Sequence, residues 1–188
     1  MSDTAEAPPS GANPPEQAEA PRLMIQTQFI KDLSFENPRA PLSLEQSQQR
    51  PEIGVRVDVR GEALPDNRYE VALQLNVDAK AGDETVFVME LCYAGIFLLT
   101  NIPKESLQPL LLVECPRLLF PFARRIVADA TRDGGFPPLM IDPIDFVALY
   151  RRRQQEAQAA ANAAGTNDAP GQNDASGQSD MPSQNAMN

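Results

Sequence analysis

Residues 69–99 read YEVALQLNVDAKAGDETVFVMELCYAGIFLL, and they carry the clearest structural pattern of the chain. Two runs of alternating apolar and polar side chains flank the segment Ala81-Gly82-Asp83, which is typical of a hairpin loop. The apolar positions are Val71, Leu73, Leu75 and Val77 in the first run and Phe87, Met89, Leu91 and Tyr93 in the second. Because successive side chains of a strand point to opposite faces, the stretch predicts two antiparallel strands with a common apolar face.

Two further strands precede this hairpin. Residues 25–36 alternate with their odd positions mostly apolar, and Asn37-Pro38 ends the pattern. Residues 53–59 alternate valine or isoleucine with polar side chains, and Pro65-Asp66-Asn67 predicts the turn into the third strand. The sequence therefore predicts four consecutive strands, with Gly95 as a bulge or bend in the last.

Helical periodicity replaces the alternation after residue 100. Residues 106–115 predict a short buried helix that ends at Pro116, and a second helix is expected from Pro121 to Gly134. Asp142-Pro143 predicts the start of a third helix. Strands followed by helices indicate an α+β fold, a four-stranded antiparallel sheet with helices packed on one face.

Charge and composition divide the chain into three parts. Residues 1–22 are rich in proline, residues 154–188 are polar, and neither segment has enough apolar side chains to offset the entropy of ordering. We therefore predict disordered tails around a domain at 23–153. The formal net charge is −10, of which seven units lie in the tails. This acidity argues against nonspecific binding to nucleic acid or to an anionic membrane.

Several classes of site are excluded by composition. The chain has no histidine, so it cannot form a Ser-His-Asp triad or a histidine-ligated metal site, and its two cysteines are too few for a thiolate zinc site. No phosphate-binding glycine loop with its lysine is present. We expect no catalytic residues, metal or cofactor. An acidic N-terminus and the lack of a long apolar run lead us to expect a cytoplasmic protein.

Two surface features permit alternative interpretations. The apolar side chains of the fourth strand and of residues 110–122 form either an ordinary core or an oligomer interface with a peptide groove. Asp32, Glu36 and Glu90 form either a solvated sheet face or a docking patch for a basic partner. Patterning alone favours the ordinary core and the solvated face.

Six ordered segments resemble the SecB family of protein-export chaperones. They are residues 25–38, 69–71, 94–97, 119–124, 135–139 and 146–150. The resemblance implies a homotetramer, built as a dimer of dimers, of four-stranded α+β subunits. It implies an ATP-independent holdase that binds unfolded precursors of secreted proteins, keeps them translocation-competent and delivers them to the SecA motor ATPase. It implies neither a cofactor nor an enzymatic activity.

The resemblance also implies roles for individual residues. The SecA-binding face would contain Asp32, Glu36, Val88 and Glu90. The oligomer interface would contain Met89, Leu91 and Tyr93. The client groove, where the unfolded precursor binds, would contain Phe120, Phe122, Phe146, Leu149 and Tyr150. Val88 is smaller and Tyr93 bulkier than the family pattern, and the long C-terminal tail offers only dilute acidic charge for a SecA contact.

Three alternatives stay open at this point. The chain could be a general or toxin-linked chaperone of the same fold that does not serve export. It could be an acidic protein-interaction module without a client groove. An enzyme is disfavoured, because no paired catalytic constellation occurs at a recognisable spacing.

Overall fold

The computed structural model describes residues 20–45 and 50–165. A four-stranded antiparallel sheet is formed by β1 (Arg22–Glu36), β2 (Glu52–Leu64), β3 (Arg68–Ala81) and β4 (Glu84–Thr100), in the order β1-β4-β3-β2. The helices are α1 (Leu42–Glu45), α2 (Lys104–Pro109), the π-helical turn η1 (Leu110–Glu114), α3 (Cys115–Asp133) and α4 (Phe146–Gly165). Of the described residues, those up to Tyr150 form one compact unit, and those from Arg151 form a second.

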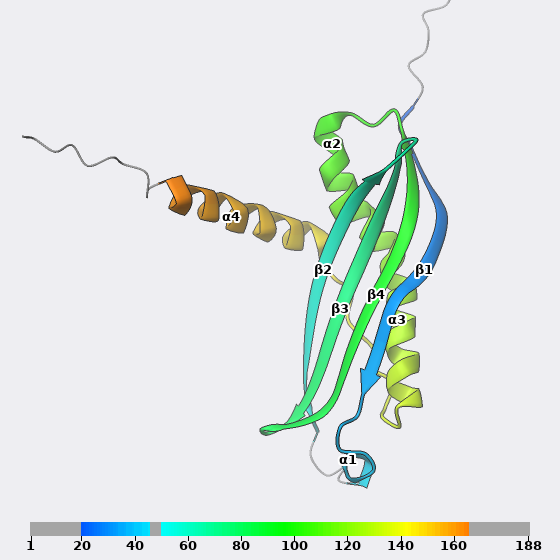
Figure 1. The fold of residues 1–188 in the computed structure, drawn as a ribbon, viewed down its shortest axis with the longest axis vertical. Helices are drawn as coiled ribbons and strands as arrows, with labels where there is room; N and C mark the ends of the chain where they lie inside the picture. Colours follow the sequence, from blue (N-terminus) through cyan, green and yellow to red (C-terminus); the bar gives the residue numbers. More distant parts are fainter. Residues whose placement is uncertain (1–19, 46–49, 166–188) are drawn as a thin grey trace, which may run out of the picture. The chain divides into compact units, whose positions relative to one another are not determined.

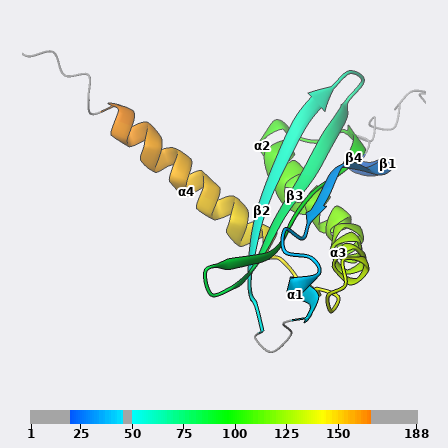
Figure 2. The ribbon, with the colours of Figure 1, turned by 60° about the horizontal axis from the view of Figure 1, so that its bottom comes forward.

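The helices α2 and α3 cover one face of the sheet, as Figures 1 and 2 show from two directions. This arrangement confirms the predicted α+β fold with helices on one face. We name the helix-covered side the inner face and the opposite side the outer face. The turn between β2 and β3 has positive φ angles at Asp66 (62°) and Asn67 (56°), a conformation that these two residue types tolerate well.

The core lies between the inner face and the helices. The predicted apolar positions of β3 and β4 are buried there, with Leu73, Leu75, Met89 and Leu91 fully inaccessible. From the helical side, Leu119 and Val127 of α3 are equally inaccessible. Burial of each such side chain stabilises the fold by about 1.5–3 kcal/mol, so this layer holds the sheet and α3 together.

Strand β1 departs from simple alternation. It pairs with β4 along its whole length, but the register shifts between Ile25 and Thr27 and again between Ile30 and Asp32. Each shift is a bulge that adds one residue, so the alternation of faces reverses at the first bulge and is restored at the second. Phe29, opposite Ala94, therefore lies on the outer face. The prediction that Phe29 lies on the same face as Leu33 was therefore wrong.

The predicted helix break at Pro116 and Pro121 was also wrong. Helical backbone runs from Lys104 to Asp133 through α2, η1 and α3, with Pro121 inside α3. A proline ring clashes with the carbonyl group four residues earlier in a regular helix. The wide turn η1 directly precedes Pro116, and there the Cys115 N–H donates to the Leu110 carbonyl. This change of hydrogen-bond pattern lets the helix continue past the proline.

Helix α4 begins later than predicted and extends further. Its N-cap is Asp145 rather than Asp142, because the Asp145 Oδ1 atom accepts hydrogen bonds from the N–H groups of Val147 and Ala148, both at 3.0 Å. Residues 154–165, expected to be part of a disordered tail, continue α4 because alanine and glutamine favour helix. The remaining tail predictions, for residues 1–19 and 166–188, lie outside the described residues.

Candidate functional site

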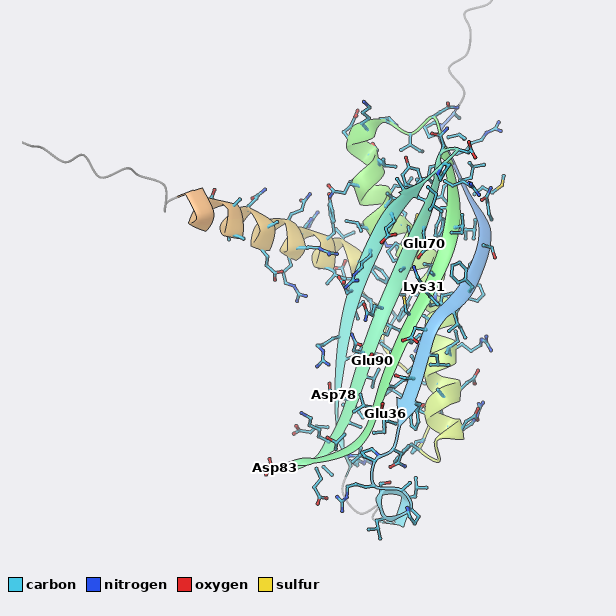
Figure 3. All side chains as sticks on the ribbon, viewed as in Figure 1. Lys31, Glu36, Glu70, Asp78, Asp83 and Glu90 are labelled. Carbon is cyan, nitrogen blue, oxygen red and sulfur yellow. The ribbon has the colours of Figure 1, made fainter. Side chains whose placement is uncertain are left out.

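The four residues predicted for the SecA-binding face lie together on the outer face of β1 and β4. In the strand register, Asp32 is opposite Cys92, Ser34 is opposite Glu90, and Glu36 is opposite Val88. Residues that are paired across two strands project from the same face, so the three carboxylates form one row with Glu90 in the middle and Val88 beside Glu36 at its end. Figure 3 shows Glu36 and Glu90 near the same end of the sheet.

These carboxylates are exposed and uncompensated. Within the described part of the chain, Asp32, Glu36 and Glu90 form no ion pair. A neighbouring acid, Asp78 on β3, is opposite Val88 and does form an ion pair. Its partner is Arg56 on β2, with 3.1 Å between Nη1 and Oδ1. The group therefore carries negative charge that a basic partner could neutralise.

A neutralised pair lies further along the outer face. Lys31, the extra residue of the second bulge, forms an ion pair with Glu70 on β3 and so reaches across β4 (Figure 3). The hydrogen bond to Glu70 raises the pKa of Lys31. Cys92 lies beside this pair in a hollow of about 130 Å³, and burial raises the pKa of its thiol.

The residues predicted for the oligomer interface lie on the inner face. Met89 and Leu91 are completely buried within the subunit, so neither side chain can touch another copy directly. Tyr93 is at the edge of this layer, opposite Ile30 of β1, and its hydroxyl donates a hydrogen bond to Gln28 Oε1 at 3.2 Å. The ring of Tyr93 stacks on Phe122 of α3.

Exposed apolar side chains surround Tyr93. Phe122 is 46% exposed, and Leu118, one helical turn before it, is similarly accessible. On β1, Ile30 and Leu33 project from the inner face and are also more than 40% exposed. We name the four residues Ile30, Leu33, Leu118 and Phe122 the apolar edge.

The five residues predicted for the client groove occupy different surroundings. Phe120 and Phe146 are buried and meet edge to face, with their ring centroids 6.1 Å apart. Leu149 and Tyr150 are half-buried near the start of α4, and the Tyr150 hydroxyl donates to Gln108 Oε1 at 3.4 Å. Phe122 belongs instead to the apolar edge. The structure therefore does not gather these five side chains around one hollow.

A further hollow lies elsewhere and was not predicted from the sequence. This cavity of about 760 Å³ is open to the surface and lies between residues 39–44, residues 50–53, the β3–β4 turn and the α3–α4 loop. Its apolar lining consists of Leu44, Pro51, Ile53, Ala81, Val86, Phe87, Phe136, Pro137, Pro138 and Leu139. Arg39 and Glu84, which form an ion pair, also line it. The one sequence feature that could have indicated this cavity was the segment 135–139. It combines Phe136 with two prolines that disfavour a helix or strand, so an apolar loop is expected there.

An aromatic cluster forms the floor of this cavity. The rings of Phe87 and Phe136 have centroids 5.0 Å apart, and Phe35 stacks on Phe87 at 5.4 Å. The rings hold one another in place by packing. The sides that line the cavity form an apolar surface that can contact aliphatic or aromatic side chains in several orientations.

Neither cysteine takes part in a cluster of possible metal ligands. No group of three acidic or cysteine side chains within residues 20–45 and 50–165 could hold a metal ion. Burial raises the pKa of the Cys115 thiol to about 12. None of the described helices is long and apolar enough to cross a membrane.

A family model described as "Preprotein translocase subunit SecB" matches residues 16–157. The chain belongs to the SecB family of protein-export chaperones. The Protein-export protein SecB of Parvibaculum lavamentivorans is 53% identical over 84% of this chain and 94% of its own length. That of Bradyrhizobium diazoefficiens is 52% identical over 81% of this chain and 94% of its own.

A solved structure supports the SecB fold independently. It is the Mycobacterium tuberculosis SecB-like chaperone Rv1957 in complex with a ChAD peptide from the antitoxin Rv1956 HigA1. It covers 65% of this chain and 91% of its own, with a TM-score of 0.56 and 18% identity. SecB proteins are chaperones and not enzymes, so family membership confirms both the predicted class of function and the predicted lack of catalysis.

Proposed function

We propose that this SecB-family chain holds precursors of secreted proteins unfolded and delivers them to the SecA motor ATPase. One observation carries the delivery step. Asp32, Glu36 and Glu90 lie in register on adjacent strands, exposed and without ion pairs among the described residues. Complementary charge at such a face raises the association rate and selects a partner with a basic docking segment.

The client surface in this proposal is centred on the 760 Å³ cavity. Its aromatic floor accepts apolar side chains of many sequences, which suits a chaperone that binds unfolded chains with little selectivity. Among the residues predicted for the groove, Leu149 and Tyr150 keep exposed surface for a client, whereas Phe122 belongs to the apolar edge. Phe120 and Phe146 would support that surface from the core.

Assembly into a tetramer, a dimer of dimers, is the third part of the proposal. The apolar edge supports it, because four large apolar side chains exposed around Tyr93 lose their contact with water when a second copy covers them. Met89 and Leu91 would then influence assembly from within, by setting the position of α3. Several client surfaces on one tetramer raise the avidity for a long unfolded chain.

Holding requires no energy source in this mechanism. A chaperone that binds the unfolded state withdraws it from the folding equilibrium, so slowly folding precursors are captured and fast folders escape. Release then depends on competition at SecA. Such a protein acts in the cytoplasm, where the precursors are made.

The alternative functions are less well supported. The SecB-like chaperone bound to an antitoxin peptide shares only 18% identity with this chain, so it supports a common fold and no more. The relatives with more than 50% identity are export proteins. An interaction module without client binding would not account for the open cavity with its apolar lining.

The direct test mixes the purified full chain with a slowly folding precursor diluted from urea and, separately, with SecA. We expect binding of both at micromolar concentrations and a delay in precursor folding. A chain that binds SecA alone would be the acidic interaction module. A chain that binds only the precursor would be a chaperone outside export.

A further inference from the structure

Thr131 connects α3 to the loop that forms one wall of the cavity. Within the described residues it is the one polar side chain that is completely buried. Its hydroxyl shares one hydrogen between two main-chain carbonyl oxygens. The oxygen of Val127 is 2.9 Å away and that of Ala128 is 3.1 Å away. The same oxygen accepts a hydrogen bond from the N–H of Leu139 at 2.9 Å.

The segment between Phe136 and Leu139 is attached to Thr131 at both ends. The Phe136 N–H donates to the main-chain carbonyl of Thr131 at 3.1 Å, and the Leu139 N–H donates to its side chain. Between these two points stand Pro137 and Pro138, whose rings fix φ and leave no N–H group. The segment is therefore a short stiff strap held by one residue.

Every residue of this strap lines the cavity. Phe136 packs on Phe87 within the aromatic floor, while Leu139 extends the wall on the other side of the two prolines. A binding surface that is fixed before the ligand arrives avoids the entropy of ordering it during binding.

We propose that the Thr131 hydroxyl is a positioning group for client binding, which holds the strap of residues 136–139 in the form that accepts an apolar client segment. This inference rests on the proposed client cavity. Thr131 does not touch the client itself. Its hydroxyl acts through Leu139, so removal of the hydroxyl loosens the wall and increases the rate at which the client dissociates.

A matched pair of substitutions separates positioning from stability. Thr131→Val keeps the side-chain volume and loses the hydroxyl, whereas Thr131→Ser keeps the hydroxyl and loses a buried methyl group. Both variants lower the free energy of unfolding of the full-length protein. Only Thr131→Val should weaken binding of a permanently unfolded probe, reduced and carboxymethylated α-lactalbumin, by about fivefold, the equivalent of one hydrogen bond.

The experiment includes Phe136→Ala as a test of the cavity itself. If Phe136→Ala weakens probe binding while Thr131→Val and Thr131→Ser behave alike, the positioning role is wrong and the client cavity stands. If Phe136→Ala binds the probe as tightly as the unmodified protein, the proposed cavity is wrong, and the positioning role with it. Hydrogen exchange of the unmodified protein provides a check that does not depend on folding of a variant. A Leu139 amide that exchanges as fast as in an unstructured peptide would also overturn the proposal.

Discussion

The ring of Tyr93 on β4 stacks on Phe122 of α3, with ring centroids 6.4 Å apart and 21° between the planes. Tyr93 is nearly buried and its hydroxyl is bonded to Gln28, whereas Phe122 is half exposed. The buried partner thus fixes the orientation of the exposed one. In the proposed tetramer, Tyr93 would therefore influence assembly through Phe122 without itself lying on the surface.

We predict that Phe122→Asp dissociates the tetramer, because a charge in the apolar edge would be buried against a second copy without a partner. Light scattering should give about four times the 20.6 kDa chain mass for the unmodified protein and a clearly lower mass for the variant. Met140→Asp changes an even more exposed apolar side chain elsewhere and should leave the mass unchanged. An unchanged mass for Phe122→Asp would remove the apolar edge from the assembly interface.

We predict that Glu90→Lys reduces SecA affinity by at least about tenfold, because it replaces attraction with repulsion at the centre of the acidic group. Binding of unfolded α-lactalbumin should be unaffected, since the cavity lies elsewhere. Glu105→Lys makes the same charge change on α2, away from the outer face, and serves as the control. Equal losses in the two variants would mean that net charge, rather than this face, attracts SecA.

A third prediction concerns Gly95, which the sequence suggested as a bulge or a bend; it is not a bulge, because it pairs regularly with Gln28 and Val71. A Cβ atom at this position would lie 2.9 Å from the Leu119 Cδ2 atom, so α3 packs directly on the glycine. We expect Gly95→Ala to lower the free energy of unfolding by about 1–3 kcal/mol in urea titrations. Gly61→Ala is the matched control, because its Cβ would make an ordinary 3.5 Å contact with Leu111. A neutral Gly95→Ala would show that α3 does not rest on β4 there.

The fourth prediction follows from Cys115. Burial raises the pKa of its thiol to about 12, whereas an unfolded cysteine ionises near pH 8.5. Between these pH values the unfolded chain releases a proton that the folded protein retains. The free energy of unfolding therefore falls as pH rises, by at most about 1.4 kcal/mol per pH unit from this group.

Urea titrations at several pH values from 8 to 11 test this slope. Other groups also titrate in that range, so the informative quantity is the difference between the unmodified protein and Cys115→Ala. That difference should shrink steadily above pH 9. Parallel curves for the two proteins would contradict a raised thiol pKa in the folded state.

Sequence patterns predicted the strands well, because each strand of the hairpin buries one face against the same helical layer. The alternation of β3 is maintained from Val71 to Val77, and all four apolar positions are buried. Helix boundaries were predicted less well around proline, since the π turn before Pro116 depends on packing of the whole helix. The N-cap at Asp145 was missed because Asp142-Pro143 offers the same local signal earlier in the chain.

The acidic residues of the candidate site were predictable for the same reason as the strands. Glu36 and Glu90 are on the outer face because strand alternation and strand pairing both place them there. The cavity could not be predicted in this way. Leu44, in the four-residue helix α1, and Leu139, in the α3–α4 loop, both line it although they are far apart in the chain, and no periodicity indicates that they meet.

Because of its two bulges, the face on which a residue of β1 lies cannot be read from its odd or even position in the sequence. Each extra residue exchanges the two faces, and only the pair together returns Leu33 to the side on which the strand began with Ile25. A natural or designed chain that lost one bulge without becoming shorter would have to turn outward either its first apolar residues or its last ones, and Asp32 and Glu36 would be inverted together with the last ones. Deletion of the extra residue itself, Gln26 or Lys31, would instead leave every remaining residue opposite its present partner. Single deletions should therefore be tolerated at these two positions and not between them, which provides a simple rule for aligning or redesigning the strand.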